Sequence, residues 1–427
     1  MIQPITHCRL CKSDHLTPLF SLGEQYVSDF IDPDVPKELH KCPINLVLCA
    51  NCTLVQLEHS APQEILYSRH YWYRSGVTNT MRLALQDITI AARDKVDLCR
   101  GDVVLDIGSN DGTLLRSYPS QLYKVGVEPA SNLAEEGAKG LNYFINDFWD
   151  IDTYWVGVAK KAKIITAIGM FYDLEDPQKF VNDVAKALHD DGIFIAQLMC
   201  LDSMLKINDV GNLAHEHLEF YSLRSLMFMY DQAGLEIIDI ETNSVNGESW
   251  RIYARKIGSS IGGPQRTDRL EAILRDEEKL ADPTFYSTYF QQWEGNKRRI
   301  VQFIRGESIK GKRTWVYGAS TKGNVLLQWL GLDLKLIEAA ADRRTELPVP
   351  KVEPVPIVKS AERIDVRVTQ THIHMLDALR DQLKPHPEIL DIREYYGRMD
   401  VLRELLRQER IRLEEQFEKI MKAKYDH

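Results

Sequence analysis

Between about positions 82 and 254, apolar residues alternate between a spacing that fits helices and one that fits buried strands. Stretches with apolar residues three or four positions apart are separated by short runs rich in β-branched residues. The runs are 103–106 (VVLD), 124–128 (KVGVE), 164–167 (IITA) and 192–196 (GIFIA). Strands that alternate with helices predict a parallel, doubly wound sheet. We therefore expect a Rossmann-like α/β domain over residues 66–260.

The regions on either side have different patterns. Residues 1–65 carry short β-like runs bounded by turn residues, which indicate a small separate module. Residues 261–310 have helical spacing and no strand, and predict a helical bridge. Near residue 313 a strand begins that leads into a glycine-bearing turn and a helix, so 311–427 should form a second Rossmann-like α/β domain. Its proline-dense stretch 348–356 is expected to be a loop, and 401–421 an amphipathic helical tail.

Composition narrows the class of protein. The chain has 427 residues, of which 44% are hydrophobic and 27% charged, enough for two or three domains with buried cores. A net charge of −9 argues against nucleic acid as a partner. No apolar run approaches the roughly 18 residues of a membrane span, and no signal-peptide pattern precedes the first cysteines. We expect a soluble, cytoplasmic protein with no membrane partner, either a monomer or a homodimer.

Five of the seven cysteines lie within the first 52 positions. Cys8 and Cys11 form one pair with two residues between them, and Cys49 and Cys52 form another. Such pairs let four thiolates close a tetrahedral site, which leaves no position for substrate. The sequence therefore predicts a structural zinc ion bound to these four residues. The remaining cysteines, Cys42, Cys99 and Cys200, are expected to be packed.

A candidate cofactor loop follows the first strand of the 66–260 domain. Asp106 ends the strand, Gly108 and Gly112 allow a tight turn, and Glu128 follows the next strand, where a carboxylate can accept hydrogen bonds from ribose hydroxyls. The three-glycine dinucleotide fingerprint is missing, and a pyrophosphate would meet like charge at Asp106 and Asp111. S-adenosylmethionine (SAM) has no phosphate and carries an ammonium group. This charge argument favours SAM over a dinucleotide.

Further residues are assigned to the same site by their place in the pattern. Asp147 follows the expected third strand and can accept from the adenine amino group, although a solvated loop acid is nearly as good an interpretation. The full set of expected cofactor residues is Asp106, Gly108, Asn110, Asp111, Gly112, Glu128, Asp147 and Met170.

Three titratable groups stand in a row after the last clear parallel strand: His215, Glu216 and His217. Histidine, with an ordinary pKa near 6.5, suits a base that takes a proton at neutral pH. A lone histidine is more often a satisfied core residue, but here two flank a glutamate. A second metal site is the competing interpretation, and no third ligand of matching type stands out.

With these motifs taken together, the sequence resembles the sugar C-methyltransferases, which act on nucleotide-linked ketodeoxysugars and carry an N-terminal zinc-binding domain. The match runs over nearly the whole chain. Besides the cysteine pairs, the segments that carry it are 71–76 (YWYRSG), 105–112 (LDIGSNDG), 126–129 (GVEP), 171–177 (FYDLEDP), 215–219 (HEHLE), 245–247 (VNG) and 317–324 (YGASTKGN).

The resemblance implies roles for individual residues. His217 would be the general base, with His215 and Glu216 beside the substrate, and the C-terminal domain would help to hold the nucleotide. The residues expected to contact the substrate are Tyr71, Tyr73, Ser75, Tyr221, Asn246, Lys322 and Asn324. SAM would be the methyl donor.

Three departures from the family pattern concern the substrate. Ala214 stands where some members have a tyrosine, and Glu248 stands where the family usually has a second glycine. After Asp342 the family's glycine-bearing loop and its Pro-Trp-His segment are replaced by a Pro-Val-Pro tract and an unfamiliar tail. These differences suggest an atypical sugar or nucleotide.

The sequence thus favours methylation of a carbon next to a ketone, at C-3 of a nucleotide-linked 4-keto-deoxysugar. A base can remove the acidic proton of that carbon while donors hold the enolate oxygen. Two alternatives stay open. One is methyl transfer to an oxygen or nitrogen of a sugar or small metabolite, and the other is a non-catalytic, zinc-stabilised binding protein.

Overall fold

The computed structural model describes residues 3–27, 40–62, 66, 71, 73–243, 245, 248–317, 320–333 and 335–341. Three expectations fall outside these residues: Asn246 as a substrate contact, the proline-dense loop and the helical tail.

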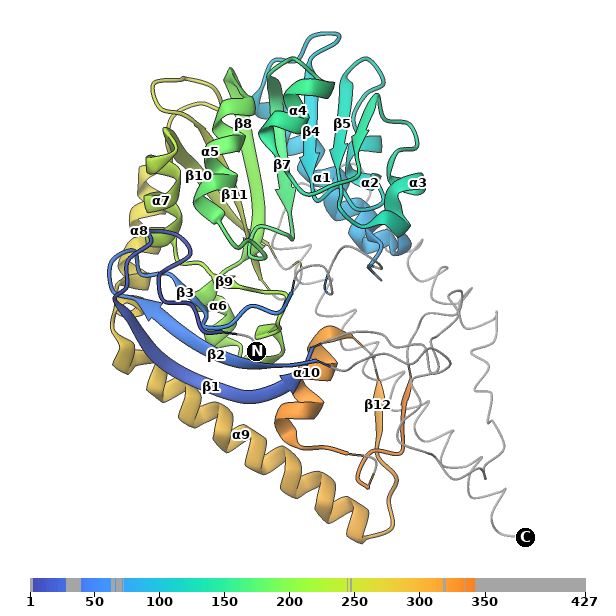
Figure 1. The fold of residues 1–427 in the computed structure, drawn as a ribbon, viewed down its shortest axis with the longest axis vertical. Helices are drawn as coiled ribbons and strands as arrows, with labels where there is room; N and C mark the ends of the chain where they lie inside the picture. The colour runs from blue at the N-terminus through green and yellow to red at the C-terminus, as the bar shows by residue number, and fades with distance from the viewer. Residues whose placement is uncertain are drawn as a thin grey trace, which may run out of the picture. The chain divides into compact units, whose positions relative to one another are not determined.

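The largest element is a seven-stranded sheet in the order β10-β11-β8-β7-β4-β5-β6 (Figure 1). Its strands are β4 (Val103–Ile107), β5 (Tyr123–Val127), β6 (Tyr143–Ile145), β7 (Ala162–Ile168), β8 (Leu188–Met199), β10 (Leu235–Asn243) and β11 (Ser249–Lys256). Neighbours from β6 to β8 run parallel, whereas β11 is antiparallel to both β8 and β10. The four apolar runs recognised in the sequence are thus strands of one sheet. Strand β11, the last of the seven along the chain, is inserted between β8 and β10.

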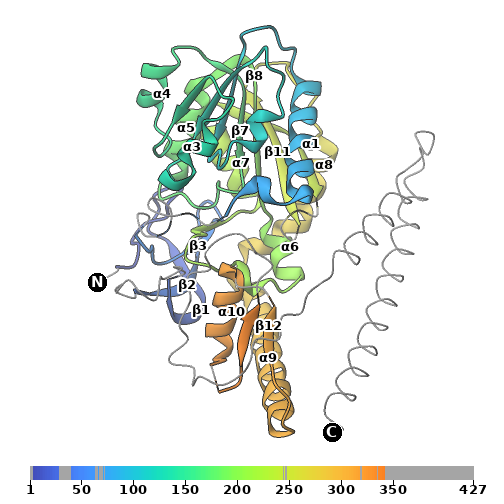
Figure 2. The same cartoon turned by 90° about the vertical axis from the view of Figure 1, so that its right-hand side faces the viewer.

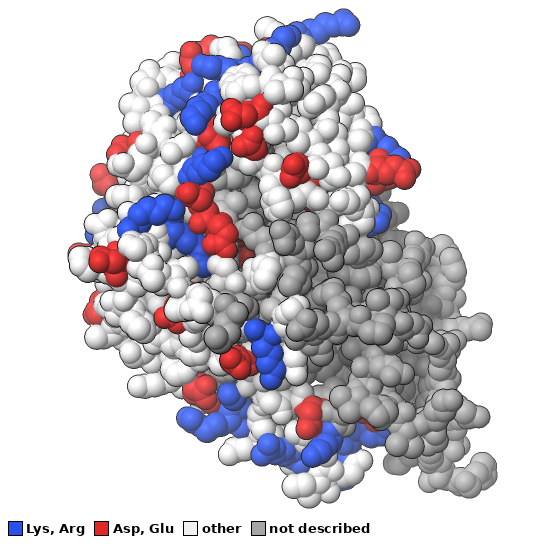
Figure 3. Space-filling model, viewed as in Figure 1, with Lys and Arg blue, Asp and Glu red and all other residues white. Residues whose placement is uncertain are grey.

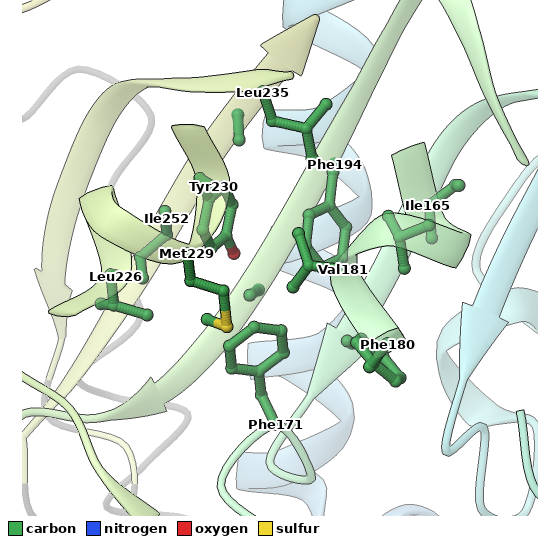
Figure 4. Close-up of a cluster of buried hydrophobic side chains, with 14 of the residues drawn as sticks. Ile165, Phe171, Phe180, Val181, Phe194, Leu226, Met229, Tyr230, Leu235 and Ile252 are labelled. Atoms are coloured by element: carbon green, nitrogen blue, oxygen red, sulfur yellow. The ribbon is translucent and has the colours of Figure 1, made fainter. Parts of the chain in front are cut away.

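Helices cover both faces of this sheet, as the turned view shows for α1 and α5 (Figure 2). The elements are α1 (Asn79–Lys95), α2 (Thr113–Arg116), α3 (Ala134–Gly137), α4 (Ile151–Gly157), α5 (Pro177–Ala187) and α7 (Leu223–Gln232). Alternate strand residues face opposite cores because side chains along a strand alternate in direction. Val104 and Ile164 pack with α1 and α2. Ile165 and Phe194 pack with α5 and α7 around Phe171 and Tyr230 (Figure 4).

The N-terminal module forms a second sheet in the order β1-β2-β3-β9. Its strands are β1 (Leu16–Tyr26), β2 (Lys41–Cys49), β3 (Val55–Leu57) and β9 (Glu219–Phe220). The last of these belongs to the segment that carries the two candidate histidines, and Val55 lies opposite Phe220 in the register. The N-terminal module is therefore completed by a strand from the part of the chain that follows β8.

After the large sheet the chain is helical, with α8 (Thr267–Glu277), η5 (Glu278–Ala281) and α9 (Pro283–Ile309). Helix α9 runs along β1 (Figure 1), where Phe20 stacks on Phe290 at 5.1 Å and meets the buried Trp293 edge-on at 5.2 Å. Strand β12 (Trp315–Tyr317), helix α10 (Thr321–Leu330) and strand β13 (Ala339–Ala341) then form a parallel βαβ unit. Its helix binds the N-terminal module, because Gln328 Oε1 accepts from the Tyr26 backbone N–H at 2.7 Å.

Short elements complete the described chain: η2 (Ser75–Val77), η3 (Ser131–Leu133), α6 (Leu201–Lys206) and η4 (Val210–Asn212). Cys42 and Cys200 are buried as expected, but the expectation for Cys99 is wrong. That residue is exposed because it lies in the loop between α1 and β4, where its backbone N–H bonds to Asp102.

Within the described residues, no helix is both long and apolar enough to cross a membrane. On the face shown in Figure 3, positive and negative side chains are interspersed.

Candidate active site and zinc centre

The four paired cysteines converge on one point of the N-terminal module. Their sulfur atoms all lie within 4.8 Å of one another, with Cys8 Sγ 3.6 Å from Cys52 Sγ and Cys11 Sγ 3.5 Å from Cys49 Sγ. Zinc–sulfur bonds of about 2.3 Å in a tetrahedron place the sulfurs about 3.8 Å apart. The cluster therefore has the size and the ligand set of a structural zinc site.

Each cysteine pair sits in the same kind of turn. The N–H of Lys12 bonds to the Cys8 carbonyl, and the N–H of Thr53 bonds to the Cys49 carbonyl, both at 3.0 Å. Lys12 and Thr53 have φ values of 59° and 60°, in the left-handed region that closes such turns. The two turns thus present two sulfurs each to a common ion.

A buried arginine within the first turn joins the zinc module to the loop after β7. Arg9 is 3% exposed and donates to the Leu57 carbonyl, to Ser60 Oγ at 2.7 Å and to Glu175 Oε2 at 3.3 Å. Beside it, Lys12 Nζ lies 3.3 Å from Asp176 Oδ1. Two ion pairs thus connect the loop 171–176 to the zinc module.

The candidate cofactor turn has the predicted conformation. Gly108 and Gly112 have φ values of 72° and 76°, and α2 begins at the next residue, Thr113. A Cβ at position 108 would lie only 2.8 Å from Met170 Cγ, so the turn after β4 and the loop after β7 are in close contact. This contact places Met170 beside the glycine turn.

Two carboxyl groups are buried next to this turn. Asp106 accepts from Thr166 Oγ1 at 2.6 Å, and burial raises its pKa to about 7. Glu128 accepts from the N–H groups of Asn110 and Ala130, each at 2.9 Å, and burial raises its pKa. A carboxylate has about four lone-pair directions, so these two bonds leave Glu128 able to accept from a ribose. Asp147 accepts from the adjacent Phe148 N–H at 2.7 Å.

Asn110 and Asp111, which were assigned to the cofactor, hold the segment 73–76 with their side chains. Asn110 accepts from the Ser75 N–H at 2.9 Å and donates to the Tyr73 carbonyl at 3.0 Å. Asp111 accepts from the Gly76 N–H at 2.7 Å. The tyrosine segment expected at the substrate is thus attached to the cofactor turn.

His217 is held between a carbonyl and an aromatic ring. Its Nδ1 lies 2.8 Å from the Asn212 carbonyl, and its ring meets the Tyr172 ring edge-on at 4.7 Å. A carbonyl can only accept, so Nδ1 carries the proton and Nε2 keeps its lone pair. Burial and the nearby Lys322 lower the His217 pKa to about 4, which keeps the ring neutral at pH 7.

Acidic and phenolic groups surround this histidine. Burial raises the pKa of Glu216 to about 7, although a hydrogen bond with the Thr321 side chain opposes the shift. Burial also raises the pKa of Tyr71, and the charges of Asp173, Glu216 and Glu128 add to the effect. These electrostatic couplings indicate that Tyr71 lies near both Glu216 and Glu128.

The other expected site residues occupy different places. His215 Nε2 donates to the Cys42 carbonyl at 2.8 Å, so this buried ring ties the segment 215–219 to β2. Tyr221 is fully buried, packs 5.5 Å from the Phe171 ring and is electrostatically coupled to Glu219 and Cys8. This position favours a packing role over the substrate contact expected from the sequence.

Two further expectations lie on α10. Lys322 Nζ is 3.3 Å from Asp209 Oδ2, and Asn324 bonds through its backbone N–H to the Ser320 carbonyl at 2.9 Å. Glu248, one of the family departures, has a φ of 76°. Glycine tolerates that conformation far better than glutamate, which is a physical reason for a glycine at this position.

The structure adds residues that the sequence analysis missed. Tyr172 contacts His217 through its ring, and its carbonyl accepts from the N–H groups of Leu218 and Glu219 at 2.8 and 3.1 Å. Asp173 is coupled to Tyr71 and Tyr172. Both lie in the loop after the predicted strand 164–167, and loops at the carboxyl ends of parallel strands are where ligands bind. That signal could have identified them.

Comparison with protein families gives three consecutive matches. Residues 8–67 match a zinc binding domain, residues 79–240 a methyltransferase domain, and residues 244–364 the C-methyltransferase C-terminal domain.

One curated relative is the C-methyltransferase NovU of Streptomyces niveus, which is 27% identical over 353 residues, 80% of this chain and 82% of that protein. Among solved structures, a SAM-dependent methyltransferase from Clostridium acetobutylicum matches 42% of this chain and 92% of its own, with 14% identity and a TM-score of 0.34. Magnesium protoporphyrin IX methyltransferase from Synechocystis matches 42% of this chain and 82% of its own, with 13% identity and a TM-score of 0.31.

Proposed function

We propose that this chain, a SAM-dependent methyltransferase with the zinc-binding, methyltransferase and C-terminal domains of the C-methyltransferases, methylates C-3 of a nucleotide-linked 4-keto-deoxysugar. The match to the C-methyltransferase C-terminal domain disfavours both alternatives considered from the sequence, an oxygen or nitrogen acceptor and a non-catalytic protein. The sugar, its nucleotide and the position of methylation belong to the proposal.

The observation that carries the proposal is the 2.8 Å contact between His217 Nδ1 and the Asn212 carbonyl. Because Nδ1–H is bound to the Asn212 carbonyl, the lone pair of Nε2 is available to a carbon acid. The C-3 proton is acidic because the 4-keto group stabilises the resulting carbanion as an enolate. A neutral, half-buried imidazole can take this proton without first losing one of its own.

The residues around the glycine turn fit the methyl donor. When bound, SAM supplies a methyl group on a positively charged sulfur. Asp106, Gly108, Gly112, Glu128 and Met170 would hold it, with Asp147 at the adenine. The buried carboxyl groups of Asp106 and Glu128 suit hydroxyl and ammonium donors, whereas a pyrophosphate would be repelled.

Two groups are suited to hold the developing enolate oxygen. Glu216 has a pKa of about 7, so a large share of it is protonated near neutrality and can donate an O–H. Tyr71 keeps its phenolic proton because its pKa is raised. His217 takes the proton from C-3, the C–H electrons form the enolate, and these electrons then form the new C–C bond as the methyl–sulfur bond breaks. Product release returns the His217 proton to solvent.

The C-terminal βαβ unit would hold the nucleotide end of the substrate. Helix α10 brings Thr321 to Glu216 and Lys322 to the turn that carries His217. Lys322 and Asn324 are the residues we assign to the substrate from this unit. Tyr73 and Ser75, held by Asn110, would contact the sugar from the opposite side.

The test is product analysis with a panel of nucleotide-linked 4-ketosugars and SAM. Nuclear magnetic resonance of the product should show a new methyl group on ring carbon 3. The His217→Gln variant should bind SAM with unchanged affinity and form no product. A methyl group on oxygen or nitrogen, or full activity in His217→Gln, would overturn the proposal.

A further inference from the structure

The turn that holds His217 is itself held by a short polar chain. Asn212, whose carbonyl accepts the His217 proton, is 2% exposed. Its side-chain Nδ2 donates to Asp209 Oδ2 at 2.6 Å, and its backbone N–H bonds to the Asp209 carbonyl at 3.2 Å. Asp209 thus fixes the position of the carbonyl that decides which histidine nitrogen is protonated.

Asp209 Oδ2 also pairs with a lysine from another part of the chain. Lys322 Nζ, on the first turn of α10, lies 3.3 Å from Asp209 Oδ2. The helix packs tightly there, because a Cβ at Gly211 would lie 3.1 Å from Lys322 Cβ and 3.2 Å from its carbonyl oxygen. One carboxylate therefore links α10, η4 and the catalytic histidine.

We propose that Asp209 is a positioning residue, which bridges Asn212 and Lys322 and so holds His217 in its Nδ1-protonated form. Through the same bridge, the position of α10 affects the protonation state and position of His217. This inference rests on the proposed function, because it treats His217 as the base. It implies that the C-terminal βαβ unit contributes to catalysis as well as to substrate binding.

The charged groups that face His217 predict how each substitution should change its pKa. Burial and Lys322 lower the histidine's pKa, whereas the Asn212 carbonyl and Asp209 raise it. Tyr172 packs on the ring from the loop after β7, and its raised pKa keeps it uncharged. Loss of the Asp209 charge should therefore lower the His217 pKa further, and loss of the Lys322 charge should raise it. If Asp209 and Lys322 only supported the fold, their substitutions would not shift the His217 pKa in opposite directions.

The experiment compares Asp209→Asn and Lys322→Met with a charge-matched control, Asp231→Asn, which removes an exposed carboxylate on α7. Asp209→Asn should lower kcat on the order of tenfold with little change in KM or SAM affinity, because a misplaced base affects the chemical step alone. Its acid limb of kcat/KM should move to lower pH, and that of Lys322→Met to higher pH. Asp231→Asn should match the wild type.

A second measurement does not depend on activity. In the full-length protein with 15N-labelled histidine, the His217 signal, assigned by its loss in His217→Gln, should report a proton on Nδ1. Asp209→Asn should give a mixture of the two neutral forms. Wild-type kcat and tautomer in Asp209→Asn, with His217→Gln inactive, would overturn the positioning role alone. Activity in His217→Gln would overturn the proposed function itself.

Discussion

Arg9 offers a test of how the zinc module supports the active site. Its guanidinium satisfies the Leu57 carbonyl and Ser60 Oγ and lies close enough to Glu219 to oppose the rise in that carboxyl's pKa. Arg9→Met would remove these donors while keeping most of the side-chain volume. The buried Leu57 carbonyl left without this donor costs about 1–3 kcal/mol, and the half-buried Ser60 hydroxyl adds less because water can reach it. The Glu175 pair adds little, because that carboxylate is 44% exposed.

The loss should appear as easier release of zinc. A chromophoric chelator present during a denaturant titration would report the midpoint of zinc release, and about 1–3 kcal/mol corresponds to a measurable shift of that midpoint. A fall in kcat should accompany it, since Arg9 also contacts Glu175 in the loop whose Tyr172 carbonyl accepts from Leu218 and Glu219, next to the proposed base His217.

The matched control is Arg266→Met. Arg266 pairs with Asp268 on the surface, where their side chains are 46% and 69% exposed, so the change should cost no more than about 0.5 kcal/mol. If Arg9→Met releases zinc at the same denaturant concentration as Arg266→Met, the buried network contributes nothing and the reasoning fails.

Three further predictions concern pH, the cofactor turn and the metal. Activity should fall as pH drops through about 4, where His217 becomes protonated. It should also fall as pH rises through about 7, where Glu216 loses its proton, and Glu216→Gln should abolish this high-pH limb in a kcat/KM profile. Gly108→Ala should weaken SAM binding about tenfold by calorimetry, because a Cβ there meets Met170. The control Gly140→Ala should leave SAM binding unchanged, because that glycine has a similar φ of 74° but its Cβ would meet no atom nearer than 3.9 Å. Zinc removal by chelation should stop methyl transfer yet leave calorimetric SAM binding intact, since the glycine turn belongs to the other sheet.

The parts of the fold that local patterns determine were predictable. The strands β4, β5, β7 and β8 follow from their apolar runs, because a strand buried on both faces has a recognisable composition. The cysteine pairs predicted the zinc cluster, because two-residue spacing is itself the geometry of the turn. The glycine turn was predictable for the same reason.

Contacts between distant segments were not predictable. Strand β9 has two residues and no strand-like pattern of its own, and it forms only because β3 offers a partner more than 160 positions earlier in the chain. The role of Asn212 is carried by a backbone carbonyl, which leaves no trace in the sequence. Tyr221 was expected at the substrate, but it follows β9 directly and its side chain is fully buried beside Phe171.

Exchange of the substrate's C-3 proton with solvent tests the central claim most directly. The enzyme would be mixed in heavy water with the 4-ketosugar nucleotide and S-adenosylhomocysteine, so that proton removal is seen without methyl transfer. The account predicts that deuterium enters C-3 at a rate that depends on enzyme and is lost in His217→Gln. Methyl transfer in the complete reaction without any such exchange, or exchange that persists in His217→Gln, would contradict a His217-generated enolate.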